Sequence, residues 1–273
     1  MTKGKSMNKT QDNELPWWHE NAGFFGDIYK EADDSYETFF EGNNELTSRT
    51  EKEAQGVINL CSLNIGASLI DCPSSYGRHS VAIAKKGINV TGIDINSRFL
   101  SLSREHAEKN NINVNFLHSD MRKLPTIGPV DAIINMFYSF GFFSNEENSE
   151  VVKEFCRILR PGGKFLMHTM VTIPAFGDGR IPLEERRTLR SGSTLVSRRR
   201  LNPITRREEG LWSLLDKDSK ERSLTPYDVR IYTTEEFADI CYNAGFSEVV
   251  FYGDWDGSRY EEKSLYLIAV ATK

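Results

Sequence analysis

Cysteine is scarce in this chain, and the few cysteines stand far apart. Among 273 residues there are four, Cys61, Cys72, Cys156 and Cys241, and no two are spaced as in a CxxC motif. This spacing disfavours a disulfide framework and a zinc site, and it suits buried thiols in a reducing compartment. We therefore expect no metal and a cytoplasmic location.

The sequence also lacks a long apolar run and an excess of positive charge. No stretch approaches the roughly twenty apolar residues of a membrane-spanning helix. The polar residues 1–13 do not resemble a signal peptide, and we expect them to form a disordered tail. The formal net charge of −5 disfavours nucleic acid and anionic membranes as partners. A monomer or a homodimer is expected.

What is present is a regular alternation of apolar segments and helical patterns across residues 65–171. The expected strands are Ser68–Cys72, Asn89–Asp94, Asn113–Ser119, Val130–Asn135 and Gly163–Val171, and the expected helices are Arg78–Lys86, Ser97–Asn110 and Glu146–Leu159. Such alternation predicts a parallel sheet with helices on both faces.

Two further segments interrupt or precede this alternation. Residues 172–232 are rich in Arg, Thr and Ser, and three runs in them are typical of antiparallel strands: Thr194–Arg200, Glu209–Leu215 and Ser223–Tyr232. They predict a β-rich insert. Residues 14–64 are expected to be helical and carry a dense group of aromatic side chains, either as core or as a lid: Trp17, Trp18, Phe24, Phe25, Tyr29, Tyr36, Phe39 and Phe40.

The alternation resumes across residues 233–273. A helix is expected over Thr234–Ala244, followed by strands over Glu248–Tyr252 and Ser264–Thr272. The loop between these strands is too short for a helical crossover, so the last strand should run antiparallel to the others.

The most informative stretch is Leu69–Ser80, where a strand ends in Asp71, a tight turn follows, and a helix starts near Gly77. A second strand then ends in Asp94. Strand, turn, helix, strand and acid at this spacing are typical of the nucleotide-binding half of a Rossmann-like sheet, in which Asp94 would accept hydrogen bonds from the ribose hydroxyls.

This turn is poorly suited to a dinucleotide. A pyrophosphate needs several glycines and free backbone amides, but Gly77 is the one glycine here, and Pro73 has no N–H. Asp71 would also repel phosphate. A ligand with an ammonium and a sulfonium and without phosphate suits these residues better, and S-adenosyl-L-methionine is such a ligand.

Residues from about Trp17 onward resemble the class I S-adenosylmethionine-dependent methyltransferases, in particular the bacterial small-molecule branch with a β-rich insert after the fifth strand. The matching motifs are Leu69–Ser80, Val90–Asp94, His118–Arg122, Val130–Phe137, Ile158–Gly163, Arg230–Thr233 and Ala244–Phe246. The resemblance implies an α/β fold with a Rossmann-like, mostly parallel seven-stranded sheet, an antiparallel last strand, an N-terminal helical lid (14–64), a cofactor domain (65–171 and 233–273) and an acceptor-binding insert (172–232).

The resemblance also implies which residues hold S-adenosylmethionine. The turn from Asp71 through Cys72 and Pro73 to Gly77 would wrap the methionine part, and the rest of the site would be, in order, Asp94 on the ribose, Ile95 on the adenine, Asp120 and Met121 on the adenine amine and ring, and Asn135 and Met136 beside the methionine part. Ser75 departs from the family pattern, because it replaces a glycine that lets the backbone approach the ligand.

Methyl transfer is an in-line displacement that depends mainly on positioning, so no single catalytic motif is expected. Three side chains are candidates: Tyr29 as a group closing over the methyl, Tyr138 as an orienting hydroxyl and His168 as a base; each could equally be structural. An arginine of the run Arg198–Arg200, or Arg206 or Arg207, could pair with an acceptor carboxylate, or the run could be a solvated strand face.

These observations favour a methyltransferase that acts on a small-molecule acceptor, on nitrogen somewhat more than on oxygen. Two alternatives stay open. The altered turn could accompany non-methyl use of the cofactor, as aminocarboxypropyl transfer or cyclisation. The chain could also be a non-catalytic partner subunit that keeps the fold.

Overall fold

The computed structural model describes residues 15–22, 24–29, 32, 45–189, 191–218 and 220–273, and the expected tail over 1–13 lies outside them. The larger of two sheets has the strand order β10-β11-β5-β4-β1-β2-β3. Its strands are β1 (Ser68–Asp71), β2 (Asn89–Asp94), β3 (Asn115–His118), β4 (Val130–Asn135), β5 (Leu159–Thr169), β10 (Glu248–Tyr252) and β11 (Leu267–Thr272).

The direction of the strands confirms the predicted fold class. Strands β1, β2, β3, β4 and β5 are mutually parallel, while β11 is antiparallel to both β5 and β10. The carboxyl ends of the parallel strands therefore meet at one edge, the place where ligands bind in open α/β sheets.

Helices cover both faces of this sheet: α2 (Glu45–Leu60), α3 (Arg78–Ala84), α4 (Ser97–Lys109), α5 (Asn145–Ile158) and α7 (Thr234–Ala244). Neighbouring residues of β4 point to opposite faces, as the pleat requires. Ile133 joins the cluster that contains residues of α5 and α7, whereas Ile134 joins the cluster that contains residues of α2 and α3, and both side chains are fully buried.

Helix ends follow from local chemistry. Asn96 caps α4, because its side chain accepts a hydrogen bond from the Phe99 amide, and asparagine is among the residues that favour this position. Gly245 ends α7 in the left-handed conformation at a φ of 103°. The fifth strand was expected to begin at Gly163, but β5 begins at Leu159, includes Arg160–Gly163 and pairs irregularly with β4.

The insert forms a separate antiparallel sheet in the order β6-β7-β8-β9. Its strands are β6 (Glu184–Thr188), β7 (Thr194–Asn202), β8 (Arg207–Leu215) and β9 (Glu221–Arg230), preceded by the short helix α6 (Ile173–Gly177). Three of these strands were predicted. The fourth, β6, has the sequence Glu-Glu-Arg-Arg-Thr, which lacks the apolar alternation by which strands are recognised.

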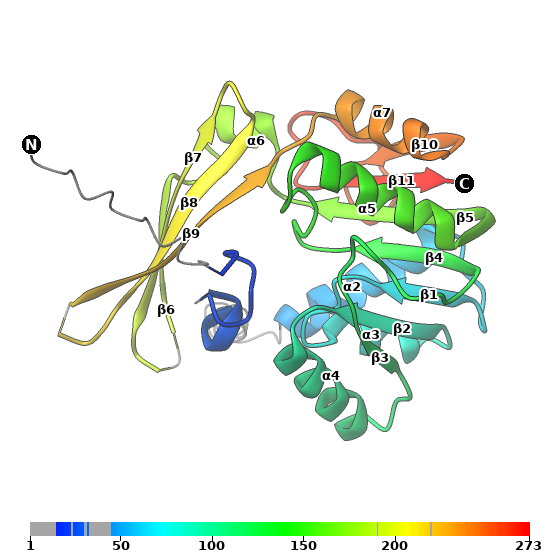
Figure 1. The fold of residues 1–273 in the computed structure, drawn as a ribbon, viewed down its shortest axis with the longest axis horizontal. Coiled ribbons are helices and arrows are strands. Elements are labelled where there is room, and N and C mark those ends of the chain that lie inside the picture. The colour runs from blue at the N-terminus through cyan, green and yellow to red at the C-terminus, as the bar shows by residue number, and fades with distance from the viewer. Residues whose placement is uncertain (1–14, 23, 30–31, 33–44, 190, 219) are drawn as a thin grey trace, which may run out of the picture.

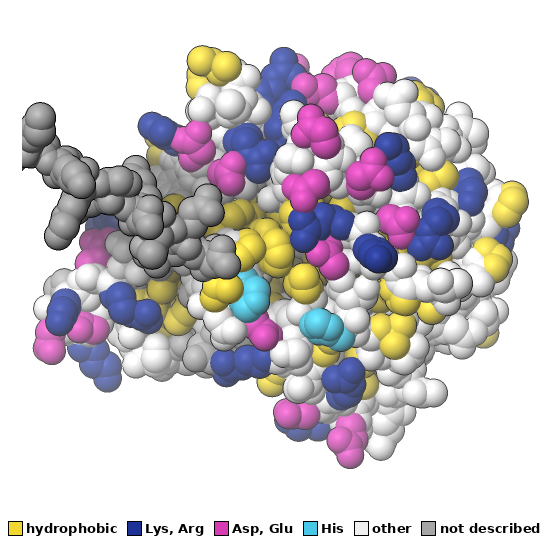
Figure 2. Space-filling view, viewed as in Figure 1, with side chains coloured by type: hydrophobic (Ala, Val, Ile, Leu, Met, Phe, Trp, Pro, Cys, Tyr) yellow, Lys and Arg dark blue, Asp and Glu magenta, His cyan; other side chains and the backbone are white. Residues whose placement is uncertain are grey.

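An N-terminal segment lies between the two sheets. In Figure 1 the insert sheet is on the left, the larger sheet is on the right, and the short π-helical element η1 (Phe24–Ile28) lies between them. Hydrogen bonds fix the segment to both sides: Asn96 Nδ2 donates to the Phe25 carbonyl (2.9 Å), and the Thr225 hydroxyl donates to the Ala22 carbonyl. Figure 2 shows hydrophobic side chains gathered where the two lobes meet.

Candidate active site

A cavity opens at the carboxyl edge of the larger sheet. It spans about 640 Å³ when the open solvent at its mouth is included. Its lining residues come from the sheet edge, the start of α4, the loop after β4 and the N-terminal segment: Trp18, Phe25, Tyr29, Cys72, Pro73, Ser75, Ile93, Asp94, Ile95, Asn96, Phe99, Ser119, Asp120, Met121, Ser139, Phe142 and Phe143. We call it the cofactor cavity.

The acid at the end of β2 is held by backbone amides. Asp94 Oδ2 accepts a hydrogen bond from the Ser75 amide, and Oδ1 accepts one from the Asn96 amide, each at 2.8 Å. Burial raises the pKa of Asp94 to about 6, although these amides act in the opposite direction. Each carboxylate oxygen has a second lone pair, so Asp94 can still accept hydrogen bonds from a ligand.

The turn after β1 shows how the chain accommodates the missing glycine. Ser75 has a φ of 49°, a left-handed conformation that glycine adopts most easily. Its carbonyl accepts from the Ser103 hydroxyl at 2.9 Å. Gly77 is irreplaceable by comparison, because its φ is 80° and an added Cβ would lie 2.9 Å from the Ser103 side chain.

Asp120, which also lines the cavity, is paired with Arg122. The sequence analysis did not predict this pairing. Oδ2 of Asp120 accepts from the Arg122 guanidinium at 2.7 Å. Burial alone would raise the pKa of Asp120, but the hydrogen bonds and charge of Arg122 outweigh it and lower the pKa. The same guanidinium lies 4.4 Å from the centre of the Phe143 ring and 5.6 Å from that of Trp18.

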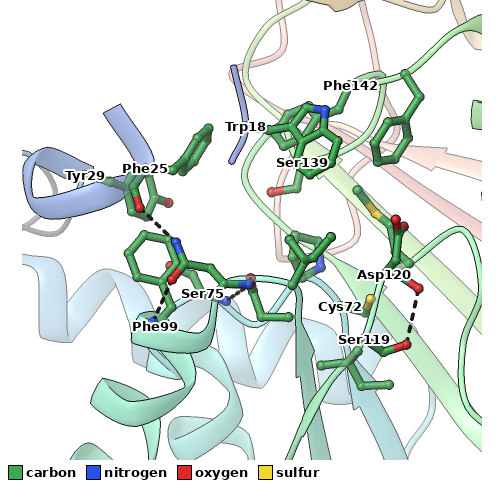
Figure 3. A pocket seen from close by; sticks show the side chains of 17 residues that line it. Trp18, Phe25, Tyr29, Cys72, Ser75, Phe99, Ser119, Asp120, Ser139 and Phe142 are labelled. Carbon is green, nitrogen blue, oxygen red and sulfur yellow. Dashed lines mark hydrogen bonds between the residues drawn. The ribbon is translucent and has the colours of Figure 1, made fainter. Parts of the chain in front are cut away.

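Aromatic side chains cover the cavity on the side away from the sheet. In Figure 3, Trp18 and Phe142 lie across the cavity from Ser75 and Cys72, and Phe25 and Tyr29 approach from the N-terminal segment. An aromatic wall of this kind excludes water from the reacting atoms. The structure thus places part of the predicted helical segment over the cofactor cavity.

Six of the ten predicted cofactor residues line this cavity: Cys72, Pro73, Asp94, Ile95, Asp120 and Met121. Four do not. Asp71 is buried and accepts a 2.6 Å hydrogen bond from the Ser80 hydroxyl, and burial raises its pKa to about 7. Gly77 lies in the turn before α3, where its left-handed backbone lets the chain enter the helix. Asn135 donates to the Cys72 carbonyl at 3.0 Å, and Met136 lies in the core on the α2 and α3 side.

A second cavity of about 940 Å³ lies beside the first, between the inner face of the insert and the N-terminal segment. The residues that line it are Phe24, Tyr29, Ala32, Arg49, Phe137, Met170, Glu185, Arg187, Leu195, Ser197, Arg199 and Trp212. We call it the insert cavity. Tyr29 lines both cavities, so its side chain is part of the wall of each.

The three predicted catalytic side chains have different surroundings. Tyr29 lines both cavities. The Tyr138 hydroxyl donates a 2.7 Å hydrogen bond to Glu208, and Tyr138 lines neither cavity. His168 is fully buried outside both cavities, accepts a 3.3 Å hydrogen bond from the Phe137 amide, and has its pKa lowered to about 3 by burial. The structure does not bring these three together.

The insert arginines also separate into two groups. Arg199 lines the insert cavity, while Arg198 and Arg200, its neighbours on β7, pair with acids on the opposite face: Arg198 with Glu184 and Glu221, and Arg200 with Glu209. Arg206 and Arg207 pair with Glu236 and Asp228 and line neither cavity.

The cofactor cavity fits the adenosyl part of S-adenosylmethionine. Two carboxylates line it, Asp94 at the end of β2 and Asp120 after β3, together with the apolar Ile95 and Met121. Within the described part of the chain, Ser75 Oγ and Asn135 Oδ1 are buried without a hydrogen-bond partner. Buried polar atoms of this kind are satisfied by a ligand or by water.

Comparison with known proteins agrees with this geometry. Residues 70–163 match the family of methyltransferase domains. YqeM of Bacillus subtilis (strain 168), named as a methyltransferase, is 24% identical over 183 residues, which cover 65% of this chain and 72% of that protein.

Two solved structures share the fold. The CcbJ methyltransferase from Streptomyces caelestis superposes with a TM-score of 0.69 at 19% identity and covers 81% of this chain and 88% of its own. CalS10 from Micromonospora echinaspora, an amino pentose methyltransferase with S-adenosylmethionine bound, gives a TM-score of 0.65 at 21% identity over 90% of this chain and 97% of its own.

Residues 70–163 belong to the family of methyltransferase domains, and the larger sheet has the Rossmann-like fold of the class I S-adenosylmethionine-dependent methyltransferases. S-adenosyl-L-methionine is the cofactor of this chain, and when bound it supplies a methyl group on a sulfonium. Within the described residues, no helix is long and apolar enough to cross a membrane.

Proposed function

We propose that the chain transfers a methyl group from S-adenosylmethionine to a small molecule held in the insert cavity, at nitrogen in preference to oxygen. The observation that carries the proposal is that Tyr29 lines both cavities. Displacement at a sulfonium needs a nucleophile in line with the methyl, and two adjoining cavities allow this arrangement. The name of CalS10, an amino pentose methyltransferase, supports a small amine acceptor.

The side chains of the site act by positioning. Tyr29 is the candidate that can contact both the donor and the acceptor, so we assign it the orienting role. His168 is neutral near pH 7, because burial lowers its pKa to about 3, and it lies outside both cavities. An amine acceptor that arrives deprotonated needs no such base.

Labelled methyl transfer tests the proposal. The purified protein is incubated with S-adenosylmethionine labelled on the methyl group and with a cell extract divided into low-mass and macromolecular fractions. We expect label in a low-mass amine, with S-adenosylhomocysteine as the by-product, and much less label with Asp94→Ala at the same cofactor concentration. Label confined to protein or nucleic acid contradicts a small-molecule acceptor, and methylthioadenosine as the by-product indicates non-methyl use of the cofactor.

A further inference from the structure

The loop after β4, residues 137–143, forms part of the wall of both cavities. Ser139, Phe142 and Phe143 line the cofactor cavity, and Phe137 lines the insert cavity. The placement of this loop therefore sets how the donor and the acceptor face each other.

This loop begins in an unfavourable backbone conformation. Phe137 and Tyr138 have φ angles of 56° and 60°, so two consecutive non-glycine residues are left-handed. Such conformations persist where the surroundings enforce them, and they cluster at functional sites. On the side of β5, His168 holds the loop, because its Nδ1 accepts from the Phe137 amide (3.3 Å) and its carbonyl accepts from the Tyr138 amide (3.1 Å).

The insert holds the same loop from the other side. The Tyr138 hydroxyl donates to Glu208 Oε2 at 2.7 Å, Arg207 donates to the Phe143 carbonyl at 3.1 Å, and the Arg230 amide donates to the Gly141 carbonyl at 2.9 Å. Of these three contacts, the one between Tyr138 and Glu208 joins two side chains.

Glu208 is a buried carboxylate with two phenol partners. It is 1% exposed, and its Oε1 accepts from the Tyr227 hydroxyl at 2.7 Å. A carboxylate accepts and never donates, so both tyrosines must donate to it. Burial, reinforced by the Glu208 charge, raises the pKa of Tyr138 and of Tyr227, which keeps both protons in place.

The other two neighbours of Glu208, Arg199 and Tyr227, connect it to the wall of the insert cavity. The Arg199 guanidinium, which lines that cavity, lies 3.7 Å from Oε1. The Tyr227 ring stacks on Trp212 at 3.9 Å, and Trp212 stacks on Phe24 at 3.8 Å. Glu208 thus contacts the loop 137–143 through Tyr138, the wall of the insert cavity through Arg199, and the back of that wall through Tyr227, which stacks on Trp212.

We propose that Glu208 is a positioning residue that fixes the loop 137–143 of the cofactor cavity against the acceptor wall of the insert. The proposal rests on the proposed function in one respect, that the insert cavity holds the acceptor. Burying a charged carboxylate between the loop and the insert is costly unless the carboxylate is fully paired. The cost fits a role for Glu208 in fixing the position of the loop.

Two tyrosine variants separate this role from a purely structural one. Tyr138→Phe and Tyr227→Phe each remove one hydroxyl and leave Glu208 one partner short, so their effects on thermal stability should be similar. Their effects on the cofactor cavity should differ, because Tyr138 belongs to the loop that lines it and Tyr227 does not. Glu209→Gln on the outer face of β8, where Glu209 pairs with Arg200 and Asn202, is the matched control for Glu208→Gln.

The measurement is the dissociation constant of S-adenosylhomocysteine, by calorimetry on the full chain. Tyr138→Phe and Glu208→Gln should each weaken binding about fivefold or more, and Tyr227→Phe and Glu209→Gln should change it less than about twofold. A Tyr138→Phe/Glu208→Gln double variant should bind no more weakly than the weaker single variant, because both changes act through the same hydrogen bond between Tyr138 and Glu208.

Equal affinity in the two tyrosine variants, or losses that add in the double variant, would overturn the proposal and leave Glu208 a structural residue. Failure of the proposed function has a different signature. In that case the wild type would bind S-adenosylhomocysteine, the variants would show the predicted pattern, and no low-mass product would carry label.

Discussion

The backbone amide of Ser75 donates a 2.8 Å hydrogen bond to Oδ2 of Asp94. Ser75 is the residue that departs from the glycine-rich pattern of the turn, and Asp94 is the acid at the end of the next strand. The turn is therefore held by the chain itself against the acid that we expect to bind the ribose, which explains how a left-handed serine is retained there.

Asp94→Ala should weaken cofactor binding. The substitution removes a buried carboxylate that accepts from two backbone amides and that we expect to accept from the ribose. We expect a loss of about 1.5–3 kcal/mol, as for a hydrogen bond to a charged group. Calorimetric titration with S-adenosylhomocysteine gives the value, and circular dichroism checks that the variant is folded. Wild-type affinity in a folded variant would contradict the ribose assignment.

Ser75→Gly should be tolerated. At a φ of 49° glycine is unstrained, and its amide keeps the bond to Asp94. The melting temperature should stay the same or rise, and the affinity for S-adenosylhomocysteine should not fall. A clear loss of affinity would show that the serine hydroxyl, which has no partner within the described residues, contacts the ligand.

Cofactor affinity should fall with pH in the acid range. The folded protein holds Asp94 with a pKa of about 6, and the ionised form is the better acceptor for ribose hydroxyls. Binding then releases a proton, so the dissociation constant should rise by up to about tenfold per pH unit below that pKa. Titrations between pH 5 and 8 check this, with Asp94→Asn as the control. A wild-type curve as flat as that of the control would be the contrary result.

Among the insert arginines, Arg199 should matter for the acceptor and Arg198 should not. The two are adjacent on β7 but point to opposite faces, and Arg199 alone of the pair lines the insert cavity. Arg199→Gln should slow labelled methyl transfer by about tenfold or more, with the affinity for S-adenosylhomocysteine changed less than about tenfold. Arg198→Gln is the matched control. A loss of cofactor affinity in Arg199→Gln without a change in transfer would assign the insert to the cofactor.

Truncation should divide the N-terminal region in two. Deletion of residues 1–13 should leave activity intact, because that stretch is polar and has no apolar anchor. Deletion through residue 29 should abolish turnover, because Trp18, Phe25 and Tyr29 line the cofactor cavity. Labelled methyl transfer by both truncated chains is the measurement. A folded, fully active chain that starts after residue 29 would show that these aromatics are neither lid nor required core.

Patterns that depend on neighbours in the chain could be predicted. The alternation of strands and helices, the cap at Asn96 and the antiparallel last strand all follow from local periodicity, capping chemistry and loop length. Six of the ten expected cofactor residues line the cavity for the same reason, since each stands at the end of a parallel strand or in the turn after it.

Contacts between distant segments could not be predicted. Glu208 is 70 residues from Tyr138, and no periodicity indicates that the two meet. The pairing of Arg122 with Asp120 is different, because the two are only two residues apart and the local sequence could have indicated it. His168 was a reasonable base by sequence, since nothing in its local pattern shows that Phe137, Trp255 and Tyr266 surround its ring.

The sequence by itself determined the fold class, the cofactor and the edge of the sheet at which the cofactor binds, because turn chemistry and strand ends are local properties. The tertiary structure alone decided which arginine of the run lines a cavity, and that the insert and the N-terminal segment together build a second cavity. It also decided that the buried Glu208 carboxylate joins the insert to the loop 137–143. These features depend on which faces are buried against each other, and that is settled when the two sheets and the segment between them pack.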